Sequence, residues 1–304
     1  MFYVSGMDIM SDSRISGMLL SQDHRLRLAW RIVLAWLGFF GCLLVVGGAV
    51  HTVTSWLPEV TSNAAASVGI AASALGLVWL LRRHIDRRPW SGIALTLHRA
   101  AIPHLLAGIV LAGVVSVAAA AATVQLGLAD WRWSAETTND GGLAITIILI
   151  ALSTVLVQAF PEELVFRGYM YANLGETLPL WATVVSSSLI FGSMHVFSDQ
   201  GATTAGQHAT YAVAATGFGL MLAACRMVSG MLWLGIGFHC GFDVCNNRLT
   251  IVHHGAFIPA WLIVLVVLIL GAAFTIAIRQ WRAPADWRAI PGDTWRCAGR
   301  RGHR

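Results

Sequence analysis

Long apolar runs separated by short polar segments make up most of the chain. Crossing a hydrocarbon core of about 30 Å takes roughly 20 mainly apolar residues in a helix, and in lipid only a helix or a closed barrel satisfies every backbone polar group. We therefore predict an all-α fold, a polytopic membrane helical bundle forming one integral-membrane domain over residues 1–304. About eight transmembrane helices are expected, at 32–52, 63–81, 101–128, 143–165, 179–197, 207–225, 230–247 and 257–278.

Composition supports this interpretation. The chain is 57% hydrophobic and only 12% charged, whereas soluble domains carry about 25% charged residues. All 20 basic residues are arginine, which together with many alanines and glycines indicates a GC-rich bacterial genome. No basic stripe of the kind that binds nucleic acid is present, so we expect the lipid bilayer and no nucleic acid as partners.

The arginines are distributed unevenly across the predicted membrane. With a cytoplasmic N-terminus, 18 of the 20 fall on the cytoplasmic side, and only Arg132 and Arg248 fall on the other. This asymmetry follows the positive-inside rule. We therefore predict a multi-pass protein of the cell membrane, with cytoplasmic tails at 1–27 and 280–304 and both termini cytoplasmic.

Two adjacent acids, Glu162 and Glu163, lie in the apolar run ALSTVLVQAFPEELVFRGYMYANL, followed by Arg167. An ionisable group inside a membrane segment is costly and indicates a functional site. Glu163 and Arg167 have the i, i+4 spacing and order that favour a salt bridge on a helix. Glu162 points elsewhere, so we expect it to face a hydrated cavity and accept a proton; a purely structural charge cluster is the alternative.

Two further polar pairs occur on other apolar helices. Phe191 and His195 in FGSMH are i, i+4 neighbours, as are His239 and Asp243 in HCGFD. His195 alone is compatible with a buried core histidine, and a His–Asp pair with an orienting contact, a metal site or a proton relay. Together with Glu162 they supply the groups needed to activate water and stabilise an oxyanion.

The three motifs resemble those of one membrane family. EELVFR, FGSMH and HCGFD are similar to the EExxxR, FxxxH and HxxxN/D motifs of the CPBP intramembrane proteases, which include the type II CAAX prenyl endopeptidases and lysostaphin-resistance-protein-A-like proteins. The resemblance covers about residues 150–247, the family core. It implies hydrolysis of a peptide bond in a membrane-associated protein or peptide, in a cavity open to the cytoplasm.

Carried over by position, the resemblance assigns catalytic roles to Glu162, His195, His239 and Asp243. Glu162 would be the general base, His195 would hold the attacking water, and His239 and Asp243 would stabilise the oxyanion, with Glu163, Arg167 and Phe191 in support. Asparagine is common where this chain has Asp243. An ionised aspartate would repel an oxyanion, so Asp243 must be protonated, orient His239 or bind a metal. No cofactor is certain; Glu162, His195, His239 and Asp243 could ligate zinc in a metalloprotease.

Straight helices would place Glu162 and His195 toward opposite membrane faces. We expect the glutamate helix to start near residue 150 and continue to about Asn173, which brings Glu162 near its middle. Two other functions use the same residues: a proton-coupled transporter or channel with a relay of ionisable groups, and a non-catalytic membrane scaffold or immunity protein.

Overall fold

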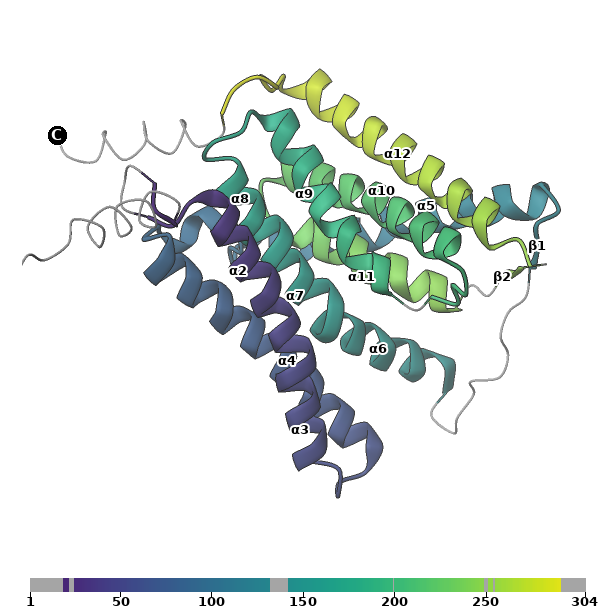
Figure 1. Cartoon of the computed structure of the whole chain (residues 1–304). Coiled ribbons are helices and arrows are strands. Elements are labelled where there is room, and N and C mark those ends of the chain that lie inside the picture. Colours follow the sequence, from purple (N-terminus) through teal and green to yellow (C-terminus); the bar gives the residue numbers. More distant parts are fainter. Residues whose placement is uncertain are drawn as a thin grey trace, which may run out of the picture.

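A computed structural model describes residues 19–21, 25–131, 142–198, 200–248, 251–253 and 255–290 (Figure 1). Much of the predicted N-terminal tail and the end of the C-terminal tail therefore lie outside the described residues. The predicted all-α membrane bundle is confirmed. Within the described part, seven helices are long and apolar enough to cross a membrane: Leu28–Val53, Glu59–Ile85, Ala101–Gln125, Ile147–Leu174, Leu180–Phe197, Ala205–Ser229 and Phe257–Arg282.

Several of these spans contain short helical turns of another type, labelled η, that are π-helical or 3₁₀-helical. The first span joins α2 (Leu28–Gly41), η1 (Cys42–Val46) and α3 (Gly47–Val53), and the second joins α4 (Glu59–Leu80) to η2 (Leu81–Ile85). After η3 (Trp90–Ile93) come α5 (Ala101–Gln125), α9 (Leu180–Met194) with η7 (His195–Phe197), α10 (Ala205–Ser229) and α12 (Phe257–Arg282).

The fourth span is the most irregular. It runs through α6 (Gly142–Thr154), η5 (Val155–Ala159), α7 (Phe160–Glu162), η6 (Glu163–Met170) and α8 (Tyr171–Leu174). Pro161 lacks a backbone N–H and its ring crowds the carbonyl four residues earlier, which disturbs the α-helical hydrogen bonding. π-helical turns in a helix are frequent at functional sites. The helix continues to Leu174, as expected from the need to place Glu162 near its middle.

The predicted span at 230–247 forms α11 (Trp233–Arg248), a helix of 16 residues. This is shorter than the roughly 20 residues that a bilayer crossing takes, and most of its side chains between Leu234 and Phe242 are buried in the bundle. α11 packs along α5 through glycines. A Cβ atom at Gly241 would lie 3.0 Å from the Ile109 Cα, and one at Gly237 would overlap the Leu105 backbone. Small residues of this kind let membrane helices approach closely.

The close contact between α5 and α11 predicts a sharp difference between two glycines of α5. A Cβ at Gly108 would lie 2.6 Å from the Phe238 backbone nitrogen, whereas a Cβ at Gly113 meets nothing within 4 Å. We expect Gly108→Ala to lower the melting temperature in detergent, because overpacking against backbone costs about 1–3 kcal/mol. Gly113→Ala should leave it unchanged, and equal melting temperatures for the two variants would contradict the close packing.

A short antiparallel pairing joins β1 (Ala129–Trp131) to β2 (Ile251–His253), with Ala129 opposite His253. The strands lie at the end of α5 and beside the start of α12 (Figure 1). They connect two loops at the same end of the bundle and do not alter its helical class.

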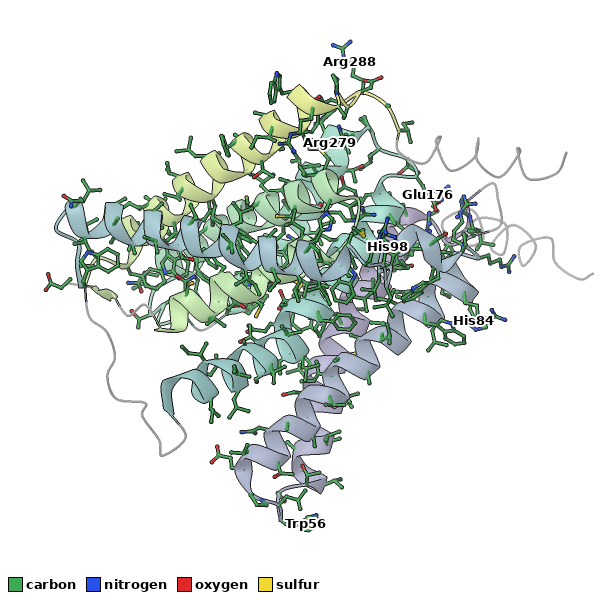
Figure 2. The ribbon with its side chains drawn as sticks, turned by 180° about the vertical axis from the view of Figure 1, so that it is seen from behind. Trp56, His84, His98, Glu176, Arg279 and Arg288 are labelled. Atoms are coloured by element: carbon green, nitrogen blue, oxygen red, sulfur yellow. The ribbon has the colours of Figure 1, made fainter. Side chains whose placement is uncertain are left out.

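The opposite end of the bundle is rich in arginine. A cavity of about 580 Å³ is lined there by arginines from four segments and by the loop after α8, and we call this the arginine-rich end; its polar lining includes Arg82, Arg88, Glu176, Arg226 and Arg279. Figure 2 shows Glu176 and Arg279 far from Trp56, which lies between α3 and α4 at the other end of the first two spans.

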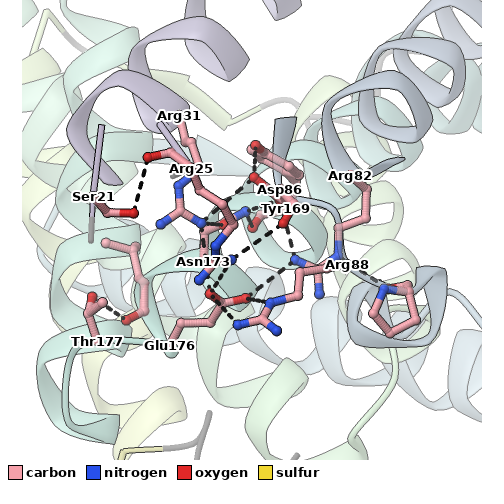
Figure 3. A network of polar contacts seen from close by, with 12 residues as sticks. Ser21, Arg25, Arg31, Arg82, Asp86, Arg88, Tyr169, Asn173, Glu176 and Thr177 are labelled. Carbon is pink, nitrogen blue, oxygen red and sulfur yellow. Dashed lines mark hydrogen bonds and ion pairs between the residues drawn. The ribbon is translucent and has the colours of Figure 1, made fainter. Parts of the chain in front are cut away.

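A buried polar network joins α2, η2 and α8 at the arginine-rich end (Figure 3). The Asp86 carboxylate accepts hydrogen bonds from the Tyr169 hydroxyl and the Asn173 amide, both at 2.9 Å, and from Arg82 at 3.3 Å. Burial alone would raise the pKa of Glu176, but hydrogen bonds and ion pairs with Arg88 and Arg25 lower it overall. The network fixes the last turns of the fourth span.

Candidate active site

The structure brings Glu162, His239 and Asp243 together. His239 Nε2 lies 3.8 Å from Glu162 Oε2 and 3.5 Å from Asp243 Oδ2. Glu162 comes from the broken fourth span and the other two from α11, one turn apart on the same face. One imidazole nitrogen therefore faces two carboxylates from two helices.

Glu163 and Arg167 form a buried ion pair next to this group of residues. Arg167 Nη1 donates to Glu163 Oε1 at 3.1 Å, confirming the predicted i, i+4 pair, and both side chains are almost fully buried. Arg167 Nη2 also donates to the Gly219 carbonyl at 3.1 Å, and its guanidinium lies 4.2 Å from the Phe191 ring centre. Arg167 thus links the fourth span to α9 and α10.

Glu163 has a second contact that spacing along one helix could not reveal. Its Oε1 lies 3.5 Å from His239 Nδ1, so Glu162 and Glu163 approach the two different nitrogens of one imidazole ring. Gly235 of α11 makes room for this approach, because a Cβ there would lie 2.7 Å from Glu163 Oε2. Glu163 therefore helps to orient His239 as well as pairing with Arg167.

His195 contacts the Phe191 ring, and that ring in turn lies near His239. The ring centres of His195 and Phe191 lie 4.7 Å apart, and the Phe191 ring also lies 6.2 Å from that of His239. His195 Nδ1 lies 3.0 Å from the Phe191 carbonyl oxygen. A carbonyl only accepts, so Nδ1 carries the hydrogen and Nε2 is left as an acceptor in the neutral ring. Among the described residues, no hydrogen bond or ion pair joins His195 directly to Glu162.

Several polar atoms of the site are buried without a hydrogen-bond partner among the described residues: Glu162 Oε2, Glu163 Oε2, His239 Nδ1 and Asp243 Oδ2. Buried polar atoms are nearly always paired with protein or with ordered water. Because these atoms occur around one imidazole, they are available to bind a water molecule or a polar group of a substrate.

The four candidate ligands do not form a metal-binding set. Within the described ranges, no three side chains of His, Cys, Asp or Glu are arranged to hold a metal ion. The His239 ring nitrogens lie 3.5–3.8 Å from carboxylate oxygens of Glu162, Glu163 and Asp243. The mechanism proposed below uses side chains and water.

Sequence patterns missed three residues that shape the site. The Phe218 ring lies 5.0 Å from that of His239, and the Tyr211 ring lies 5.8 Å from that of His195. Gly219 supplies the carbonyl that binds Arg167. All three belong to α10, which carries no conspicuous polar motif in its buried half. The Gly237–Gly241 spacing on either side of His239 was one indication in the sequence of close packing.

Comparison with known families agrees with this geometry. Residues 144–245 match the model of a family described as Rce1-like, type II CAAX prenyl endopeptidase Rce1-like. The matched segment resembles that family. It contains all seven predicted site residues, and the predicted recognition is confirmed. The Rce1-like family is a protease family, which supports an intramembrane protease of CAAX-protease type in general. A comparison with curated proteins found no match.

Proposed function

We propose that the protein is an intramembrane endopeptidase that hydrolyses a peptide bond of a membrane-associated protein or peptide. The observation that carries the proposal is the approach of the Glu162 carboxylate to the His239 imidazole, in a buried site where four polar atoms have no hydrogen-bond partner among the described residues. A carboxylate base beside a proton-donating imidazole is the pair that peptide hydrolysis needs.

In the proposed mechanism, Glu162 takes a proton from a water molecule that also donates to His195 Nε2. The water oxygen attacks the peptide carbonyl carbon, and protonated His239 donates a hydrogen bond to the resulting oxyanion. Glu162 then passes its proton to the amine nitrogen as the C–N bond breaks. The carboxylic acid product and the free amine leave, and Glu162 is again ionised.

Asp243 is best explained as a positioning residue for His239. Its Oδ2 lies 3.5 Å from His239 Nε2 on the same helix face. Together with Glu163 on the other ring nitrogen, it favours the protonated imidazole that an oxyanion requires. The aspartate would then act through His239 and would not itself face the oxyanion.

The proposal predicts loss of cleavage in His195→Ala. Cells carrying the wild type or the variant would be compared for peptides released to the medium and for membrane-protein fragments, by mass spectrometry. We expect the products to fall by about 10²-fold, because a misplaced water molecule costs that order of rate. His84→Ala, which removes an exposed histidine, is the matched control. Unchanged products in a His195→Ala variant that inserts and folds normally would overturn the proposal.

Metal removal provides a separate prediction. Because no three side chains of His, Cys, Asp or Glu among the described residues are arranged to hold a metal ion, we propose that activity does not need zinc. The purified protein should retain its cleavage activity after dialysis against chelator, with metal content measured on the same sample. Activity that is lost with the metal and restored by zinc would instead identify a metalloprotease.

A further inference from the structure

We propose that the cavity at the arginine-rich end binds the headgroup of an anionic phospholipid, with Arg226 and Arg279 holding its phosphate. The cavity has a volume of about 580 Å³ and is lined by none of the seven predicted site residues. The first lining residue on the fourth span, Tyr171, follows Glu162 by nine positions, about 13 Å along a helix. The cavity is therefore separate from the candidate active site, and the inference does not depend on the proposed function.

Two of the four arginines that line the cavity already have acid partners. Arg82 Nη1 lies 3.3 Å from Asp86 Oδ2, and Arg88 Nε lies 3.1 Å from Glu176 Oε1. Asp86 is held in turn by the buried network at the end of the fourth span (Figure 3). These two arginines therefore belong to the wall of the cavity, and their charges are used within the protein.

The other two arginines have no acid partner in the part of the chain that the structure describes. The Arg226 side chain makes no hydrogen bond or ion pair there, its Nε is buried, and its Cζ lies 5.7 Å from the Tyr171 ring centre. The Arg279 guanidinium donates to the Ala283 carbonyl, which carries no charge. Buried charges are normally paired, so two such guanidinium groups in one cavity indicate that an anion completes the site.

The depth of the two arginines suits a lipid phosphate. Arg226 lies in the last turn of α10 and Arg279 in the last turn of α12, and both helices are long enough to cross a membrane. One turn is about 5 Å long, so both guanidinium groups lie where the helices leave the hydrocarbon core and enter the headgroup region. A helix C-terminus carries roughly half a negative charge, which offsets only part of the charge on each arginine.

The remaining lining identifies the ligand as an anionic amphiphile. Four arginines and two acids, Glu176 and Asp286, line the cavity, so its formal net charge is +2, four positive against two negative. Leu180, Met227 and Ile290 add an apolar wall against which the first carbons of a lipid would pack. Guanidinium groups bind phosphate through paired N–H···O bonds, and basic pockets between membrane helices are typical sites for anionic headgroups.

Thermal melting of the purified full chain in an uncharged detergent tests this site. We expect phosphatidylglycerol to raise the wild-type melting temperature by about 5 °C when it is present at about 100 times its Kd. Phosphatidylcholine, which has no net charge, should leave the melting temperature unchanged. Removing Arg226 leaves no acid unpaired among the described residues, so Arg226→Gln should melt at or above the wild-type temperature without lipid and gain nothing from phosphatidylglycerol. An equal gain in Arg226→Gln, or no gain in the wild type, would overturn the proposal.

Two further variants locate the effect in the cavity. Arg279→Gln should also lose the gain from phosphatidylglycerol, and it keeps the test decisive if Arg226→Gln does not fold. Arg83→Gln removes an exposed arginine of η2 that does not line this cavity, so it should keep the full gain. Loss of the gain in Arg83→Gln to the same extent would mean that lipid responds to the charge of the whole end, and would overturn a specific site.

Two other sources of an anion are tested in the same assay. Inorganic phosphate at the concentration of the lipid should give no gain, and an equal gain would identify a soluble phosphate and overturn the lipid assignment. Asp293 is the one acid that follows Ile290 in the sequence. A gain that appears only in Asp293→Asn would show that the chain's own carboxylate occupies the cavity, and would also overturn the proposal. Melting is measured without cleavage, so these results are independent of those for His195→Ala.

Discussion

Glu162→Gln is expected to lower the rate of peptide cleavage by about 10²–10⁴-fold, the range that a general base contributes. Glutamine has nearly the same shape as glutamate, so packing beside His239 is retained. Its amide cannot accept a proton from water, and this step is the one assigned to Glu162. The rate would be measured on purified protein with a peptide identified from the cellular comparison, and the melting temperature on the same sample.

The exposed Glu59 at the start of α4 offers a matched control, because Glu59→Gln makes the same chemical change away from the site. It should cleave at the wild-type rate. Glu162→Asp adds a graded test: the carboxylate remains but is withdrawn by one methylene, so activity should fall between those of the wild type and Glu162→Gln. A Glu162→Gln protein that melts normally and cleaves at the wild-type rate would contradict the role of Glu162 as base.

The same variant separates the protease from a proton-coupled transporter. A relay through Glu162, His195 and His239 would make proton flux in liposomes depend on Glu162, while cleavage products would not change. The protease predicts the opposite result. The scaffold alternative predicts that neither quantity changes, so one variant and two measurements distinguish the three functions.

The features that followed from sequence depend on local helix geometry. Glu163 and Arg167 are neighbours on any helix with their spacing, and they pair at 3.1 Å. The extension of the fourth span to Leu174 also followed, because a longer helix places Glu162 near its middle. Apolar length located the spans, since crossing the hydrocarbon core takes roughly 20 mainly apolar residues.

Contacts between helices were harder to predict, because they depend on rotations and distances that spacing along one helix does not determine. Glu163 was assigned only to Arg167, yet it also lies beside His239. Gly219 and Phe218 belong to the site because α10 packs against the fourth span and α11, a contact that spacing along α10 does not reveal. The predicted span at 230–247 forms α11, which with 16 residues is not among the helices long enough to cross a membrane. Apolar residues indicate burial in protein and burial in lipid equally well. The shared water between Glu162 and His195 remains a prediction.

Arg167→Met is expected to destabilise the protein by about 3–5 kcal/mol, the cost of leaving a buried charge without its partner. The Arg167 side chain is fully buried and its partner Glu163 is 1% exposed. In the variant, water therefore cannot solvate the negative charge left on the Glu163 carboxylate. The variant also loses the bond to the Gly219 carbonyl and the contact with the Phe191 ring. A lower melting temperature in detergent and reduced yield of folded protein would report the loss. Arg83→Met removes an exposed arginine and serves as the control.

The double variant Arg167→Met with Glu163→Gln separates stability from catalysis. Removing both members of a buried ion pair is often close to neutral, because neither charge is then left alone. We therefore expect the double variant to recover much of the melting temperature lost by Arg167→Met, with a coupling measurable by a double-mutant cycle. Its cleavage activity should stay low, because Glu163→Gln removes the carboxylate that lies 3.5 Å from His239 Nδ1 and favours the protonated ring. Equal destabilisation in the single and double variants would mean that Arg167 acts through Gly219 and Phe191 and not through its charge on Glu163.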